Sequence, residues 1–308
     1  MPDNRWVNIR RLELLVALSR LGSMREVADE LGSTTSTVSQ QLAALAHEVG
    51  APLLEPHGRR VRLTPAGRRL VEHAVTILAA VEAARAALDP GAEPAGTLRT
   101  GGFATAVRRS LLPALHTLAD TCPRVRLLVS EYEPGEAHAL LLSDDLDLAL
   151  TYDYNLAPTT LDRSLVAHRL WSTTWGLGVP AETAPPTGSA TDVVTAFRST
   201  PWIVNSRGTA DEDVVRTLAS MAGFLPDVTH RADNLDLVQD LVAAGLGVAL
   251  LPEDSVLREG VRVVPLRDPE VLLQAYAVTR TGRATWPPLA ALLRTLGPAG
   301  EDGSSVGP

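Results

Sequence analysis

Residues 33–55 read STTSTVSQQLAALAHEVGAPLLE, and this stretch decides the fold of the N-terminal part of the chain. Val38, Leu42 and Leu45 recur at steps of four and three, which predicts an amphipathic helix with one buried face. The opposite face is short, polar and nearly uncharged, and such side chains can enter a DNA major groove and hydrogen-bond base edges or phosphates. The residues predicted to contact DNA on this face and at its N-terminal cap are Thr34, Thr35, Ser36, Ser39 and Gln40.

Two shorter helices are expected before this stretch. Apolar residues between positions 12 and 18 predict a first helix that ends near Gly22. Ser23 and Glu26 have the spacing of a capping box that would start a second helix, and Gly32 can take the positive φ of a tight turn. An alternative is that the polar face of the third helix is merely solvated. Two short helices, a glycine turn and a capped third helix together favour a DNA-binding helix-turn-helix.

A two-stranded wing is predicted after the third helix. Residues 52–63 read PLLEPHGRRVRL, in which apolar and polar residues alternate around a turn near Gly58. Arginines beside a flexible turn can reach phosphates or a narrow minor groove. Arg59 and Arg60 are therefore predicted to contact DNA, whereas for Arg62 the alternative is an ion pair within the protein.

A long helix is predicted next, with Thr64 as its cap and Pro65 at its first position. Its apolar residues are spaced at steps of four and three, which is the pattern of a coiled-coil seam. The alternative is that this face packs on its own domain. A narrow seam on a helix that leads into a hinge favours pairing with another chain, through Leu70, Ala74, Ile77, Val81, Ala84 and Leu88.

Charge separates a basic head from an acidic body. Residues 1–69 hold ten arginines against seven acidic residues, whereas the whole chain has a net charge of −8. Only the head is therefore expected to approach phosphates. The chain lacks a membrane-length apolar run and a signal-peptide pattern, so a cytoplasmic protein with no membrane partner is expected. The single cysteine, Cys122, excludes an intrachain disulfide, and no metal site or cofactor is predicted.

The remaining chain alternates short strand-like runs with helical stretches, which predicts an α/β domain with a largely parallel sheet. A length of 308 residues suits two or three domains. The predicted organisation is a winged helix-turn-helix over residues 1–64, a linker helix over 65–89, a hinge over 90–96, the α/β domain over 97–296 and a disordered tail over 297–308.

Several fragments resemble the LysR-type transcriptional regulators. Besides the stretch at 33–55, these are RRLELLVALSRLGSM (10–24), GRRVRLTPAGRRLVEHA (58–74) and GTLRTGGFATAV (96–107). DLDLALTYDY (145–154) and VAAGLGVALLP (242–252) extend the resemblance over nearly the whole chain. Each fragment alone is a weak signal, but their order and spacing make a specific one.

The resemblance implies an all-α winged helix-turn-helix and a dimerising linker helix, followed by an α/β effector domain. That domain would have two Rossmann-like subdomains joined by crossover strands, as in type II periplasmic binding proteins. The implied partners are double-stranded promoter DNA, further copies of the chain in a homodimer or homotetramer, and RNA polymerase if the protein is an activator. Pro56 and His57 depart from the family, which often has arginine in the wing, so phosphate contact there rests more on Arg59 and Arg60.

The resemblance also implies a small-molecule cleft between the two subdomains. Thr105 and Thr209 fall where exposed helix amides could hold a carboxylate, and Arg207 adds a cation, so an anionic effector is expected. Helix capping and ordinary loop polarity are the alternatives for each position. The predicted effector-binding residues are Phe103, Ala104, Thr105, Tyr152, Asn205, Arg207, Thr209 and Asn234.

Two other classes of protein are weighed against a regulator. An enzyme is not expected, because the sequence contains no HExxH or GxxxxGK[ST] motif. A solute-binding protein would fit the C-terminal fold. The missing export signal and the N-terminal helix-turn-helix argue against it.

Overall fold

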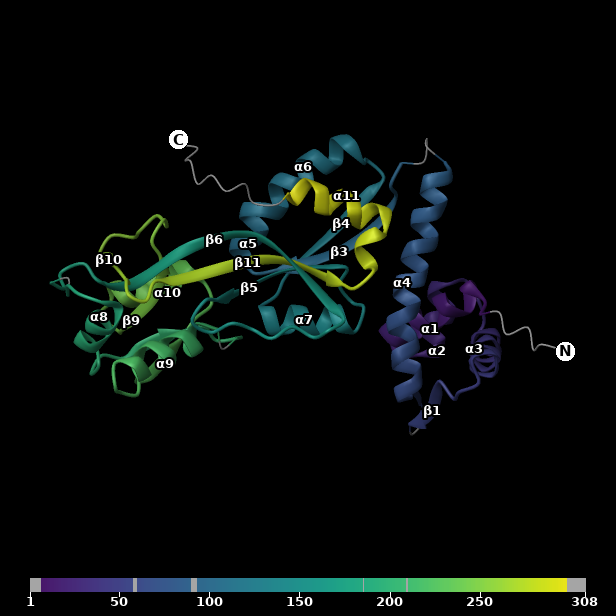
Figure 1. The fold of residues 1–308 in the computed structure, drawn as a ribbon, viewed down its shortest axis with the longest axis horizontal. Coiled ribbons are helices and arrows are strands. Elements are labelled where there is room, and N and C mark those ends of the chain that lie inside the picture. Colours follow the sequence, from purple (N-terminus) through teal and green to yellow (C-terminus); the bar gives the residue numbers. More distant parts are fainter. Residues whose placement is uncertain (1–6, 58–59, 90–92, 185, 209, 298–308) are drawn as a thin grey trace.

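The computed structural model describes residues 7–57, 60–89, 93–184, 186–208 and 210–297. A compact N-terminal head packs along one half of the long helix α4 (Pro65–Leu88), and a larger α/β body lies on the other side of that helix (Figure 1). Within the described residues, no helix is both long and apolar enough to span a membrane.

The head contains the three predicted helices and the predicted wing. Gly22 ends the first helix in the left-handed region, at φ +68°, and Gly32 has φ +59°, as predicted. The capping box at Ser23 is wrong, since the Ser23 side chain makes no capping hydrogen bond. The elements of the head are α1 (Ile9–Leu21), α2 (Met24–Glu30), α3 (Thr35–Val49), β1 (Leu54–His57) and β2 (Arg60–Leu63).

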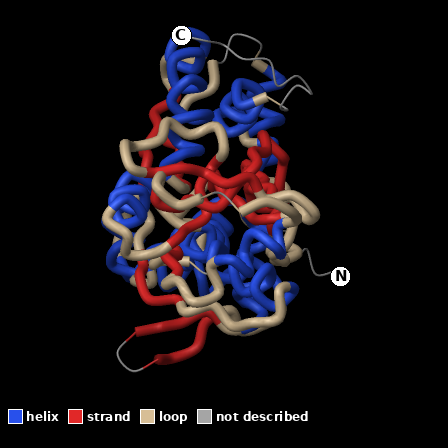
Figure 2. The backbone as a smooth tube through the Cα atoms, turned by 90° about the vertical axis from the view of Figure 1, so that its left-hand side faces the viewer, coloured by secondary structure: helices blue, strands red, loops and turns tan. Residues whose placement is uncertain are grey.

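The wing is an antiparallel ribbon that projects from the head (Figure 2). Its register pairs Leu54 with Leu63 and Glu55 with Arg62. Arg62 Nε donates to Glu55 Oε1 at 2.7 Å, so the ion-pair alternative for Arg62 is confirmed. Arg59 and the side chain of Arg60 lie outside the described residues.

Helix α4 begins as predicted, because Thr64 Oγ1 accepts a hydrogen bond from Gly67 N at 3.0 Å. Its predicted seam divides into two halves. Ala74 is completely buried and packs with Leu70 against the core of its own head, so the assignment of Ala74 to an interchain seam is wrong. The C-terminal half is open, with Ile77 at 42% and Leu88 at 86% exposure.

The body consists of two lobes. The first lobe contains β3 (Gly96–Gly102), β4 (Val125–Glu131) and β5 (Leu148–Tyr154), and the second contains β7 (Trp202–Val204), β8 (Val228–Arg231), β9 (Val248–Pro252) and β10 (Val261–Pro265). The strands β3, β4 and β5 are parallel to one another, and so are β7, β8 and β9.

Two long strands cross from lobe to lobe. Strand β6 (Leu165–Pro180) runs outward and β11 (Val271–Arg280) returns beside it, antiparallel (Figure 1). Strand β11 also pairs antiparallel with β5, and β6 with β9 and β10. The nine-stranded sheet is therefore mixed. The predicted largely parallel sheet is correct within each lobe and wrong where the lobes join.

Helices cover both lobes. In the first lobe, α5 (Ala104–Ala106), a π-helical segment η1 (Val107–Leu111) and α6 (Leu112–Thr121) follow one another without a break, and α7 (Pro134–Leu142) follows β4. The last helix, α11 (Pro287–Leu296), packs on α6. In the second lobe the helices are α8 (Ala190–Ala196), α9 (Ala210–Met221) and α10 (Leu235–Ala243).

The body contacts α4 directly after β11. Thr76 Oγ1 on α4 donates to the carbonyl oxygen of Thr281 at 3.1 Å. Gly282 has φ +79°, and a Cβ there would lie 2.4 Å from the Thr76 side chain. A glycine is therefore needed at 282 for both the backbone conformation and the close approach to α4.

Candidate functional site

The first candidate site is the outer face of α3. Val38, Leu42 and Leu45 are at most 1% exposed and fix one face of the helix in the head core. A hydrogen bond also links α3 to α1, because Arg11 Nε donates to Gln41 Oε1 at 2.8 Å. This packing leaves the other face exposed, and the exposed residues there include Thr34, Thr35, Ser36, Ser39 and Gln40.

The N-terminal cap of α3 is formed as predicted. Thr34 Oγ1 accepts from Thr37 N at 3.2 Å and lies 2.9 Å from Thr37 Oγ1. The Thr34 hydroxyl is therefore engaged within the protein, whereas Thr35 and Ser36 after it are exposed. A helix start held in this way presents free N–H groups and small hydroxyls on the same surface.

The second candidate site is a cleft of about 360 Å³ between the two lobes. Both lobes and the crossing strand β6 contribute to its walls. Six of the predicted effector-binding residues line it, namely Phe103, Ala104, Thr105, Tyr152, Asn205 and Asn234. Thr209 lies outside the described residues.

Aromatic side chains form one wall of the cleft. Phe103 stands edge-on to Tyr152, with ring centroids 4.7 Å apart, and Trp171 lies 6.1 Å from Phe103. Trp175 of β6 stands edge-on to the buried Tyr154 at 5.5 Å. The wall therefore offers ring faces and edges to an apolar or cationic ligand.

A buried carboxylate, Glu133, and a partly buried one, Asp211, form the floor. Tyr152 Oη donates to Glu133 Oε2 at 3.0 Å, and Tyr154 Oη donates to Asp211 Oδ1 at 2.9 Å. Burial raises the pKa of Glu133, although the hydrogen bond from Tyr152 opposes this. Burial also raises the pKa of Asp211 to about 6, against the hydrogen bond from Tyr154.

Asn205 lies beside this floor at the end of β7. It is 4% exposed, and its Nδ2 donates to Tyr152 Oη at 3.5 Å. Among the described residues, no donor reaches Asn205 Oδ1, and no acceptor reaches Trp175 Nε1. Buried polar atoms are usually hydrogen-bonded, so unpaired ones in a cleft point to a missing partner.

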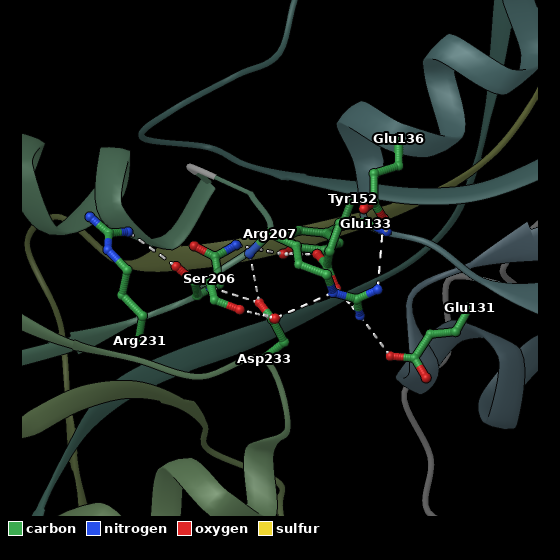
Figure 3. A network of polar contacts seen from close by, with 9 residues as sticks. Glu131, Glu133, Glu136, Tyr152, Ser206, Arg207, Arg231 and Asp233 are labelled. Carbon is green, nitrogen blue, oxygen red and sulfur yellow. Dashed lines mark hydrogen bonds and ion pairs between the residues drawn. The ribbon is translucent and has the colours of Figure 1, made fainter.

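Arg207 does not supply the free cation that the sequence predicts. Its guanidinium donates to Glu131 at 2.9 Å and to Asp233 at 3.3 Å, and Glu136 and Glu133 lie 3.7 and 3.9 Å away (Figure 3). It is not among the residues that line the cleft. Arg207 instead links the second lobe to the first through these carboxylates.

The polar helix starts also differ from the expectation. Asn234 Oδ1 accepts from Asp236 N at 2.9 Å and from Leu237 N at 3.1 Å, so the capping alternative is confirmed for Asn234. The α10 amides are thus already occupied by the protein. Thr105, at the start of α5, remains partly exposed toward the cleft.

Sequence reasoning missed the strongest features of the cleft. Glu133 looks like an ordinary residue before a helix, and Asp211 like an acidic residue in a first helical turn. Trp171 and Trp175 both lie on β6 and line the cleft, but neither was predicted as an effector-binding residue. For Glu133 and Asp211, the only signal in the sequence was that acidic groups are favoured at helix starts.

Comparisons with known proteins match both the head and the body of the chain. Residues 9–68 match the family described as bacterial regulatory helix-turn-helix protein, lysR family, and residues 91–300 match the LysR substrate binding domain. A probable hydrogen peroxide-inducible genes activator of Mycobacterium avium is 30% identical, over 92% of this chain and 88% of the relative. The transcriptional dual regulator GltC of Bacillus subtilis is 27% identical, over 77% and 78%.

Solved structures share the fold. A cysteine variant of full-length OxyR from Pseudomonas aeruginosa superposes with a TM-score of 0.70 at 18% identity, over 94% of this chain and 95% of that one. Full-length CbnR complexed with its target DNA has a TM-score of 0.51 at 19% identity, over 94% and 98%. With two family matches that together cover most of the sequence, this chain belongs to the LysR family of bacterial transcriptional regulators.

Proposed function

We propose that this regulator reads promoter DNA through the exposed face of α3, with Arg59 and Arg60 of the wing on the phosphate backbone. The observation that supports this proposal most strongly is the composition of that face. Ser36, Ser39 and Gln40 are exposed, short and uncharged, on a helix whose other side is locked in the core. Such a surface fits a major groove without repelling phosphates.

The reading unit is a dimer or a tetramer. The C-terminal half of α4 leaves Ile77, Val81, Ala84 and Leu88 at least partly open to solvent on one side. An apolar stripe on a helix is stabilised when a second copy covers it. The chain would act in the cytoplasm, with RNA polymerase as a further partner if it activates transcription.

The signal is a small molecule bound between the lobes. Strand β11 lines the cleft at Leu273 and ends at Arg280, directly before the Thr281 carbonyl that accepts from Thr76 of α4. A ligand that changes how the lobes meet would move this strand end against α4. Reversible binding is the favoured signal, because Cys122 is the single cysteine and is buried.

Base reading by α3 is tested with Gln40→Ala. On a duplex that the wild-type protein selects from a random pool, we expect affinity to fall about tenfold or more, since a good side chain–base pair contributes about 1–3 kcal/mol. On a scrambled duplex the affinity is expected to stay nearly unchanged. Fluorescence anisotropy with both duplexes measures the ratio.

Gln41→Ala is the matched control. Gln41 is the neighbouring glutamine, but its Oε1 accepts from Arg11 inside the head. The ratio between the two duplexes is expected to stay at the wild-type value in this variant. An equal loss of affinity on both duplexes in Gln40→Ala would rule out base reading by this face.

A further inference from the structure

The cleft between the lobes carries more negative than positive charge. Its described lining includes two arginines, Arg108 and Arg109, against the six carboxylates of Glu131, Glu133, Asp211, Asp233, Asp236 and Asp254. Arg109 already lies over the Trp171 ring at 4.4 Å, and its Nη1 is 4.0 Å from Asp254. The positive charge that could attract an anion is therefore partly paired within the protein.

The acidic excess is concentrated at the floor. The single charge of Arg207 is shared among Glu131, Asp233 and, at 3.9 Å, Glu133. Glu133 and Asp211 accept side-chain hydrogen bonds from neutral tyrosines. A tyrosine hydroxyl satisfies one carboxylate oxygen but leaves the charge in place. Two neighbouring carboxylates, one buried and one partly buried, favour a compensating cation.

Asn205 gives an independent indication. Its Oδ1 is a buried acceptor without a donor among the described residues, and Asn205 lines the cleft beside Tyr152 and Glu133. The missing partner of such an atom is a hydrogen-bond donor. Carboxylates and an amide oxygen next to ring faces are the usual surroundings of a bound ammonium or amidinium group.

We propose that the effector carries a positively charged nitrogen, bound by Glu133, Asp211 and Asn205 Oδ1, on an aromatic or apolar body that packs against Phe103 and Trp175. This inference rests on the proposed effector role of the cleft. It replaces the anionic effector expected from the sequence, which relied on Arg207 as a free cation. Thr105 and Arg108 also line the cleft and have donors for an acceptor group on the same ligand. A cleft of about 360 Å³ suits a small organic molecule.

Three probes of similar shape test the charge preference. Phenethylamine, 2-phenylethanol and 3-phenylpropanoate differ chiefly in the charge of one end. Titration calorimetry with the full chain at pH 7.5, backed by tryptophan fluorescence, is expected to give the amine an affinity about tenfold or more above that of the other two. An amine that binds no better than the alcohol or the carboxylate, or that does not bind, overturns the proposal.

Variants that each remove one charge test whether the preference for the amine arises in the cleft. Glu133→Gln and Asp211→Asn keep the acceptors for the two tyrosines and are each expected to reduce the preference for the amine several-fold. Asp120→Asn removes one charge from an exposed position on α6 outside the cleft, and is expected to keep the wild-type preference. An equal reduction in Asp120→Asn would mean that net charge, rather than the cleft, attracts the amine, and would overturn the proposal.

DNA affinity measured on the same preparations separates this inference from the proposed function. If the amine is not preferred but the protein still binds DNA selectively, only the assigned class of effector is wrong. Failure to bind DNA selectively removes the proposed function, whatever the amine does.

Discussion

Replacing both Ile77 and Val81 with glutamate is expected to convert the protein into monomers. Ile77 is 42% exposed and Val81 partly exposed on the half of α4 that its own head does not cover. In a dimer these positions would meet their copies, and four buried carboxylates would face one another without compensating charge. Light scattering after gel filtration is expected to show a mass of 32.7 kDa in place of twice that value or more.

The same variant is expected to lose affinity for a two-half-site operator. A monomer contacts one half-site at a time, and losing the second contact reduces the overall affinity by about 10² to 10⁴-fold. Ala80→Glu with Ala87→Glu is the matched control, because both positions are exposed on α4 but lie off the seam. Dimers that persist in the Ile77 and Val81 variant would place the interface elsewhere.

Asp211→Asn is expected to stabilise the ligand-free body at pH 8 and to have little effect near pH 4. Burial raises the pKa of Asp211 from 3.8 to about 6, and the nearby Glu133 and Asp233 add to this, while Tyr154 opposes it. The folded state therefore binds a proton more tightly than the unfolded state. The resulting stability is present below about pH 4 and is lost as the pH rises through about 6.

The neutral amide copies the protonated acid while still accepting from Tyr154. At pH 8 the gain in the free energy of unfolding is expected to be about 2–3 kcal/mol, from about 1.4 kcal/mol per pKa unit. Urea unfolding followed by tryptophan fluorescence at the two pH values measures it. Asp120→Asn again serves as the control. A gain that is the same at pH 4 and pH 8 would contradict a raised pKa for Asp211.

Local patterns predicted the head well because its determinants are local. Thr34 and Thr64 form their caps, Gly22 takes its left-handed conformation, and Val38 faces the core. Ser23 fails as a capping-box residue although its spacing with Glu26 is right. A capping pattern states only what a side chain can reach, and the backbone of the turn decides whether it does.

The body was predicted less well because its key features are not local. The direction of β6 relative to β11 depends on a pairing across about a hundred residues, which no sequence window contains. The half of β6 before Thr174 reads LVAHRLWST, and its apolar and polar residues do not alternate, so it gives no clear strand signal.

The cleft shows the same limit. Phe103, Tyr152 and Asn205 were located from the family resemblance, and they line it. Two contacts exist only once the lobes are assembled: the pairing of Arg207 with Glu131 and the hydrogen bond from Tyr154 to Asp211. Charge pairing of this kind is the reason that the proposed effector differs in sign from the one expected from the sequence.

The most direct test of whether α3 reads DNA in a dimeric regulator is to let the full-length protein select duplexes from a random-sequence pool. The wild-type protein is expected to enrich an interrupted inverted repeat, with half-sites separated by about one or more helical turns. The double variant Ser39→Ala with Gln40→Ala is expected to retain weak, salt-sensitive binding and to enrich no repeat. Enrichment of the same repeat by this variant, or of no sequence by the wild-type protein, would contradict a base-reading role for α3.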